Sequence, residues 1–174
     1  MLKPQDVLCA CKIYSLELLR QEWSYAYLAR EVGLSQSEAH NAVGRCRQAQ
    51  IITPSGSIGR RVLRDVLAVA LPRMCFAVRG GNILGMPTSS RAPVLADKLD
   101  ASEDEILTVW PCASDHDESL LARGWELRPI YPSVPMAAAS DSVVYELLAL
   151  VDVIRVGSQQ KKQIATALTE RRLK

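Results

Sequence analysis

The residue types that most often carry enzyme chemistry are scarce in this sequence. The 174-residue chain has two histidines, His40 and His116, and it lacks a G-x-S-x-G segment that would present a nucleophilic serine. Its five cysteines include no C-x-x-C pair, and no histidine stands near them at the spacing of a zinc site. These features predict a protein that is not an enzyme and that has no catalytic, cofactor or metal site.

Three segments contain residue types that can bind ligands, but each has a simpler interpretation. The glycine-rich stretch 78–85 lacks the G-K-[ST] ending of a phosphate-binding loop, so it predicts a loop or hairpin turn. Residues 115–118 are three acids and one histidine in an acidic stretch, where consecutive residues seldom converge on one ion, so a solvated loop is favoured. Cys9 and Cys11 lie about 200° apart on a helix, so we expect one to face the core and the other the solvent, with a thiol sensor as the alternative.

The formal net charge of +2 hides an asymmetry along the chain. Residues 1–79 contain eleven basic and six acidic side chains, a balance of +5, whereas residues 80–174 contain ten and thirteen, a balance of −3. A basic first half favours a polyanionic partner, although a difference of a few charges also arises by chance. The chain has no long uncharged apolar run and does not begin like a secretory signal, so we expect a cytoplasmic protein with no membrane span.

The clearest helix start in the sequence is at Ser35. Ser35 and Glu38 have the spacing of a capping box, and the helix is expected to continue to about Gln50. Small apolar residues form its inner stripe: Ala39, Ala42, Val43 and Cys46. The side chains left mostly outward are polar: Gln36, Ser37, His40, Asn41, Arg45 and Arg47.

Two helices are expected before this one. Apolar residues at three- and four-residue steps predict a helix over 4–20. Ser24 is expected to cap a second helix that continues through Val32, and Gly33 supplies the left-handed conformation that ends it. The capped helix is therefore the third of a closely spaced set.

The segments after the capped helix are shorter. Residues 51–53 are expected to form a short strand, and the turn-forming residues at 54–57 follow. A fourth helix is predicted over about 60–74, and Pro72 is expected to end or kink it.

The stretch 28–45 resembles the helix-turn-helix of MarR-like winged-helix transcription factors, and the likeness covers roughly residues 3–74. Ala29 lets two helices cross closely, Gly33 makes the sharp turn and Leu34 fills the space between the helices. The resemblance implies that the helix after Ser35 enters the major groove of DNA. Because the segment between the third and fourth helices is so short, the wing is expected to be short or absent.

The resemblance also implies which side chains contact DNA. Residues at the start of the helix would face base edges or nearby phosphates: Ser35, Gln36, Ser37, His40 and Asn41. Arg45 and Arg47 lie farther along the helix and would hold phosphates. A second basic cluster, Arg60, Arg61 and Arg64, would reach the backbone or the minor groove.

The remainder of the chain is harder to interpret. Residues 76–135 are rich in proline, with short strands expected at 76–78 and 106–110. Two helices, over about 141–156 and from Ser158 to the end, carry apolar stripes that form either a dimer surface or an internal core. Phrases at 127–135 and 145–152 are loosely similar to the second half of bacterial MarR-like regulators and of winged-helix antitoxins of the abortive-infection type.

Together these features predict a mainly α protein with a helix-turn-helix DNA-binding domain at 1–75. Residues 76–174 would form an irregular middle with a few short strands and a C-terminal helical pair. The expected function is that of a dimeric, sequence-specific transcriptional regulator, most simply a repressor of genes with palindromic operators. The alternative is an antitoxin or adaptor that binds a protein partner, such as a nucleotidyltransferase-like toxin, through exposed anchors in the middle segment: Trp110, Trp125 and Tyr131.

Overall fold

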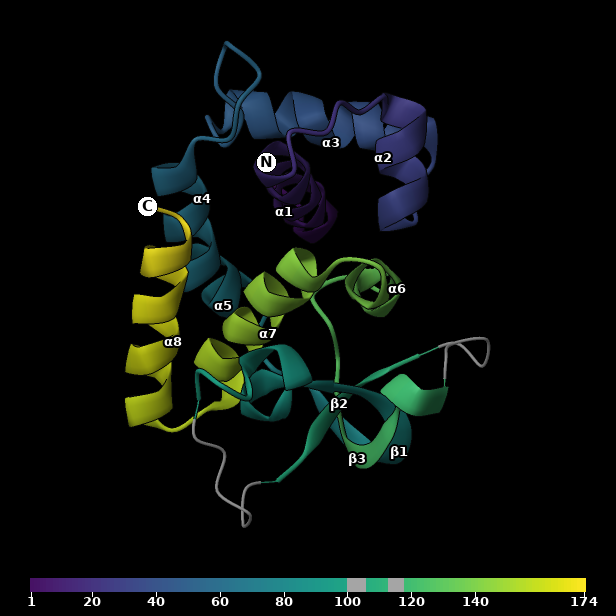
Figure 1. Cartoon of the computed structure of the whole chain (residues 1–174), viewed down its shortest axis with the longest axis vertical. Helices are drawn as coiled ribbons and strands as arrows, with labels where there is room; N and C mark the ends of the chain where they lie inside the picture. Colours follow the sequence, from purple (N-terminus) through teal and green to yellow (C-terminus); the bar gives the residue numbers. More distant parts are fainter. Residues whose placement is uncertain (100–105, 113–117) are drawn as a thin grey trace.

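The chain is mainly helical and carries one small three-stranded sheet, as the sequence predicts at this level (Figure 1). The computed structural model describes residues 1–99, 106–112 and 118–174. The helices are α1 (Pro4–Leu18), α2 (Tyr25–Val32), α3 (Gln36–Gln48), α4 (Arg60–Asp65), α5 (Leu71–Met74), α6 (Val134–Ala139), α7 (Ser142–Val156) and α8 (Gln159–Arg172). The strands are β1 (Arg79–Thr88), β2 (Thr108–Pro111) and β3 (Ala122–Leu127).

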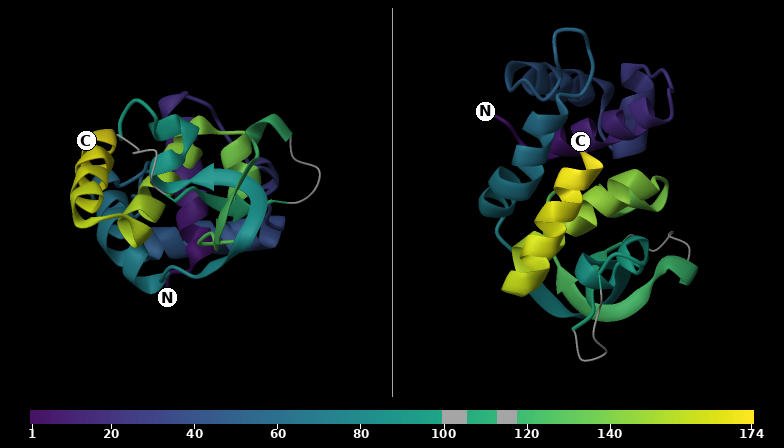
Figure 2. Two further views of the ribbon diagram at one scale, coloured as in Figure 1. Left: turned by 90° about the horizontal axis from the view of Figure 1, so that it is seen from below. Right: turned by 60° about the vertical axis from the view of Figure 1, so that its left-hand side comes forward.

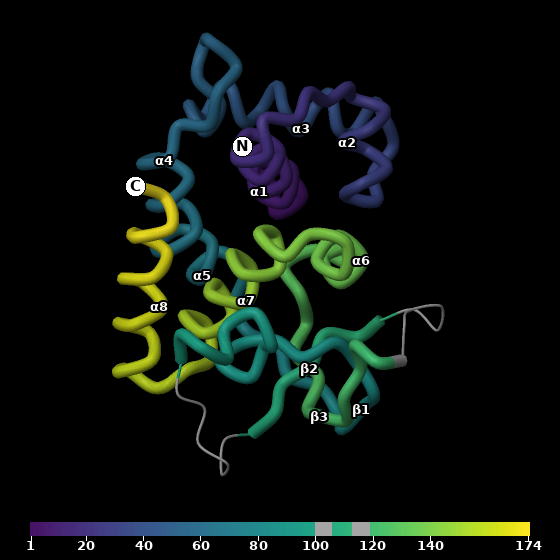
Figure 3. The backbone as a smooth tube through the Cα atoms, viewed as in Figure 1, coloured from purple at the N-terminus to yellow at the C-terminus, as the bar shows by residue number. Residues whose placement is uncertain are grey.

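Helix α1 lies between α2 and α3 on one side and α7 on the other (Figure 3). Every residue of α1 from Asp6 to Leu16 is buried. The expectation that one of Cys9 and Cys11 faces solvent is therefore wrong, because both are fully buried. Helix α7 packs against the side of α1 that faces away from α2 and α3.

Burial of α1 from Asp6 to Leu16 requires partners for the polar side chains in this stretch. The Lys12 ammonium lies 3.0 Å from the carboxylates of both Glu31 on α2 and Asp141. The Ser15 hydroxyl donates to the second oxygen of Asp141 at 2.9 Å, and that oxygen also accepts from the first amides of α7. Lys12 thus joins three helices at one point, which we call the Lys12 junction.

The helix predicted over 60–74 continues past its proline. A wider π turn at Val66–Ala70 separates α4 from α5, and the Leu71 amide donates to the carbonyl of Val66. In a regular α-helix the ring of Pro72 would clash with the carbonyl four residues earlier, and a π turn is a common way to relieve this. Pro72 therefore distorts the helix, which ends two residues later at Met74.

The three strands form a small closed barrel in which β1 is antiparallel to both β2 and β3. Residues 78–85 were predicted as a loop or hairpin turn, but from Arg79 onward they belong to strand β1. The strand expected at 76–78 therefore begins later, at Arg79. Two glycines permit the closure. A Cβ on Gly85 would lie 2.3 Å from the Trp110 carbonyl oxygen, and one on Gly124 would lie 2.7 Å from that of Leu107.

A buried ion pair attaches the barrel to α7. Asp152 on α7 accepts hydrogen bonds from the Trp110 indole (2.6 Å), the Thr88 hydroxyl (2.8 Å) and the Arg155 guanidinium (2.6 Å). Arg155 also donates to backbone carbonyls at the end of α5 and after β3. Trp110 is therefore a core residue, and its prediction as an exposed anchor is wrong.

The C-terminal helices contribute to this same core, which crosses the domain boundary predicted at 75/76. Helix α7 packs on α1, α5, α6 and α8 (Figure 2), and Val144 to Val153 of α7 are buried except for Glu146. Its apolar stripe is thus internal packing rather than the dimer surface considered from the sequence. Ala165 of α8 and Leu173, which directly follows the helix, are buried as well.

We predict that replacing Lys12 destabilises the fold strongly. Lys12→Met removes the cation that two largely buried carboxylates share and leaves Glu31 only its pair with the exposed Arg30, which costs about 3 kcal/mol of unfolding free energy in urea denaturation at pH 7. Lys3→Met, at an exposed lysine before the same helix, should cost about 0.5 kcal/mol or less. Equal small losses in the two variants would contradict the importance of the Lys12 junction.

The loss of stability caused by Lys12→Met should depend on pH in a defined direction. Burial opposes ionisation of Glu31, but the hydrogen bonds and charges of Lys12 and, to a smaller extent, Arg30 outweigh it and hold the Glu31 pKa below its usual range. A carboxyl with a lowered folded-state pKa stabilises the fold above its unfolded pKa, and this contribution is lost as the pH falls. The difference between wild type and Lys12→Met should therefore narrow in acid.

Candidate nucleic-acid interface

The connection between α2 and α3 is a tight turn that α6 holds in place. Gly33 has a φ of +65°, and the Leu34 amide donates to the carbonyl of Ala29. A Cβ on Gly33 would lie 2.8 Å from the Cβ of Ser133, and the Ser133 hydroxyl donates to the Val32 carbonyl at 2.6 Å. Both the positive φ and the close neighbour require glycine here. The relative placement of α2 and α3 is thereby fixed.

Ser35 begins α3 through the predicted capping box. Its hydroxyl accepts from the Glu38 amide at 3.2 Å and donates to the Glu38 carboxylate at 2.8 Å. The carboxylate also accepts from the Ser35 amide, and these hydrogen bonds lower the Glu38 pKa. Because the hydroxyl proton is already donated, Ser35 has none to offer a phosphate and acts as the cap.

The two faces of α3 divide as the sequence predicts. The inner residues are fully buried: Ala39, Ala42, Val43 and Cys46. On the opposite face Gln36, Ser37, His40 and Asn41 are exposed. Figure 1 shows α3 at the end of the molecule opposite the barrel. These four side chains therefore form an accessible polar surface, which we call the α3 face.

His40 is held by an aromatic contact that the sequence pattern did not indicate. Its ring centroid lies 4.9 Å from that of Tyr25, the first residue of α2, and Tyr25 packs edge-on against Trp23 at 5.6 Å. Two aromatic residues, Trp23 just before α2 and Tyr25 at its start, were the signal in the sequence from which this contact could have been predicted. The contact restricts the orientation of the imidazole on the α3 face.

Arg45 has a different role from the one expected. Its Nε and Nη2 donate to the two carboxylate oxygens of Asp6 at 2.7 and 2.6 Å, and Asp6 is fully buried in α1. The hydrogen bond to Asp6 raises the Arg45 pKa further above its usual value. The prediction of a phosphate contact is therefore corrected: Arg45 is a structural link between α3 and α1.

The other predicted arginines differ in availability. Arg47 and Arg61 are exposed. Arg60 donates to the Lys174 carbonyl at 2.8 Å and lies 5.6 Å from the Tyr14 ring centroid, and Arg64 pairs with Asp65 at 2.8 Å. Arg47 and Arg61 are accordingly the better candidates for phosphate contacts.

Residues 53–57 form a projecting turn beside these arginines, at the top of Figure 1. The strand expected at 51–53 is reduced to a single antiparallel bridge between Ile52 and Ile58. Two adjoining hollows flank the turn and the start of α4, of about 500 and 560 Å³, and both are lined by Gly59 and Val62. Arg47 lines the first hollow and Arg61 the second, so the two arginines border neighbouring hollows that share Gly59 and Val62.

The alternatives to a nucleic-acid site have less support among the described residues. Within these ranges the structure brings no three metal-ligating side chains together, and residues 115–117 of the acidic segment lie outside them. Burial raises the pKa of Cys9 to about 12 and that of Cys46 above its usual range, which keeps these thiols protonated and unreactive. Of the proposed protein-binding anchors, Trp125 is 48% exposed and Tyr131 is half-buried.

No protein-family model, no curated protein and no solved structure matches this chain. None of the helices in the described parts of the chain has the length and apolar character needed to cross a membrane.

We predict that Arg45 and Arg47 respond differently to substitution. Arg45→Ala leaves the buried Asp6 carboxylate without its cation, so Tm should fall by roughly 6–12 °C. Arg47→Ala removes an exposed arginine two residues farther along the same helix, and it should shift Tm by about 2 °C or less. In the Arg45→Ala background, Asp6→Asn should recover part of the loss because a neutral amide costs less to bury unpaired. Equal shifts for Arg45→Ala and Arg47→Ala would contradict the structural role of Arg45.

Proposed function

We propose that the protein is a sequence-specific DNA-binding regulator of the winged-helix type, with α3 as its recognition helix. The observation that carries the proposal is the α3 face, where four exposed side chains with hydrogen-bonding groups lie on a helix whose other side is fully buried. Such a helix can enter the major groove without disturbing its packing.

The chemistry of the α3 face suits base recognition. The amides of Gln36 and Asn41 can each form two hydrogen bonds to adenine, and Ser37 and His40 can donate to a base or to the backbone. Positions 36, 37, 40 and 41 lie within one and a half turns on one side of the helix. They can therefore reach neighbouring base pairs at the same time.

The proposed phosphate contacts lie beside this face. Arg47 and Arg61 border the two neighbouring hollows, and the turn at 53–57 takes the place of a short wing. Arg60 and Arg64 can contribute if DNA phosphates replace their present partners. The net charge of +5 in residues 1–79 supports a polyanionic partner on this side of the chain.

A cytoplasmic repressor acting on a palindromic operator would bind as a dimer. Because α7 is internal, the contact between the two copies of the dimer would have to use another surface. The outer side of α8, where Ile164 is 38% exposed, is the part of the C-terminal pair that is left for this purpose.

A second candidate function is that of an adaptor or antitoxin bound to a protein partner. One observation favours it: Leu84 and Trp125 are 53% and 48% exposed on paired strands of the barrel. Exposed apolar residues on a sheet often mark protein contacts. This surface lies within residues 76–174, the part expected to bind a partner.

We predict that Asn41→Ala separates recognition from folding. A binding site is first selected from randomised duplex DNA with the wild-type protein, and affinity is then measured for that site and for a scrambled duplex. The substitution should weaken binding to the selected site roughly 5- to 150-fold, and much less to the scrambled one. Stability should change by less than about 0.5 kcal/mol, because the side chain is exposed.

Asn82→Ala, at an exposed amide on β1, is the matched control and should leave both affinities unchanged. Equal losses on both duplexes would make Asn41 a backbone contact. If substitution of Gln36, His40 and Asn41 in turn leaves discrimination intact, α3 is not the recognition helix and the adaptor function becomes the better explanation.

A further inference from the structure

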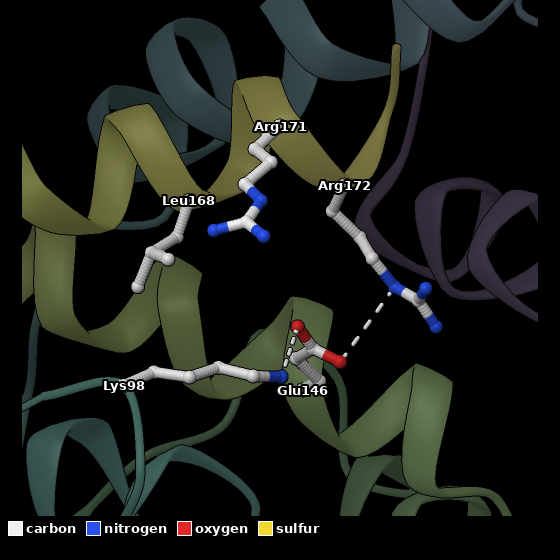
Figure 4. Close-up of a pocket in the computed structure, with 5 residues that line it drawn as sticks. All are labelled: Lys98, Glu146, Leu168, Arg171 and Arg172. Atoms are coloured by element: carbon white, nitrogen blue, oxygen red, sulfur yellow. Dashed lines mark ion pairs between the residues drawn. The ribbon is translucent and has the colours of Figure 1, made fainter.

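A third hollow lies between α8, α7 and the segment that follows the short 3-10 turn Pro93–Leu95. It has a volume of about 470 Å³ and is lined by Lys98, Glu146, Leu168, Arg171 and Arg172 (Figure 4). We call it the α8 pocket. Its volume is within the range of sites that bind small molecules.

The α8 pocket has more positive than negative charge. Among the described residues that line it, Glu146 is the one carboxylate, and it pairs with the Lys98 ammonium at 2.7 Å. Its other oxygen lies 3.6 Å from Nε of Arg172. Three cations and one carboxylate leave a balance of +2, and Figure 4 shows the Arg171 guanidinium directed into the same space. A ligand with two negative charges would neutralise the pocket.

One donor in the pocket is buried without an acceptor. Nε of Arg172 is the only buried side-chain nitrogen or oxygen without a hydrogen bond in the ranges that the structure describes. The 3.6 Å separation from Glu146 is too long for a hydrogen bond. Leaving a buried donor unsatisfied is unfavourable, so a small shift of the partly exposed Arg172 side chain that brings Nε to an acceptor oxygen in the pocket would be favourable.

The end of α8 that supplies two of the cations is held in place. The carbonyl of Arg172 accepts a hydrogen bond from the hydroxyl of Tyr14 in the buried helix α1. The backbone that carries both guanidinium groups is thus fixed to the core, which lowers the entropy cost of ligand binding.

We propose that the α8 pocket binds a small phosphate monoester. The planar donor groups of Arg171 and Arg172 match the oxygens of a phosphate, and the Lys98 ammonium adds a third cation. Leu168 offers an apolar wall for the carbon part of the ligand. The proposal is independent of DNA binding by α3.

The test is calorimetric titration of the full chain with glycerol 3-phosphate, with glycerol as the uncharged control. The wild type should bind one equivalent saturably and should not respond to glycerol. Arg171→Gln should weaken binding about tenfold, through loss of one charge-assisted contact. Arg123→Gln, at an exposed arginine on the barrel, should leave it unchanged. Absence of saturable binding, or equal weakening by Arg123→Gln, would overturn the proposal.

Glu146→Gln should change the affinity for glycerol 3-phosphate in the opposite direction to Arg171→Gln. Removal of the carboxylate that competes with the ligand should tighten binding several-fold, whereas weaker binding would show that Glu146 arranges the cations and would contradict the charge argument. A second arm distinguishes a free phosphate ester from DNA phosphates. Arg171→Gln should leave the salt dependence of DNA binding unchanged, and a slope reduced by about 0.9 would assign the pocket to DNA instead.

Discussion

The structure depends on burying a helix that contains charged residues. Lys12 and Asp6 are almost fully enclosed in α1, and each is tolerated because another element supplies the opposite charge. An unpaired buried charge costs several kcal/mol, so these ion pairs restrict where the surrounding helices can pack. Lys12 holds α2 and the start of α7, and Asp6 holds α3 through Arg45. The orientation of the proposed recognition helix follows from these contacts.

The buried ion pair between Asp152 and Arg155 does the same for the barrel. Burial raises the pKa of Asp152, while the charge of Arg155 and three hydrogen-bond donors oppose that rise. The pair connects β1 and β2 to α7, which in turn packs on α1. Both halves of the chain therefore share one core, and the surfaces that it leaves free in the described ranges include the α3 face, the outer side of the barrel and the α8 pocket.

What could be predicted from the sequence depended on short-range signals. The Ser35 cap, the turn at Gly33 and the buried stripe of α3 all follow from residues within a few positions of one another, and the structure confirms them. The role of Arg45 depends on Asp6, 39 residues away, and that of Trp110 on Asp152, 42 residues away. Neither partner is marked by local spacing. The amphipathic pattern of α7 also does not reveal whether a second copy or the chain's own helices cover it.

The central claim is that the α3 face is the surface that meets DNA. An NMR titration of the labelled protein with a short duplex tests it most directly, since it locates the contact on the protein and does not require the operator sequence. The account predicts that the largest shifts occur at the amides of Gln36 to Asn41, followed by Arg47 and the start of α4, with little change in β1 or β3. Shifts confined to the barrel strands, or none at low salt, would contradict it.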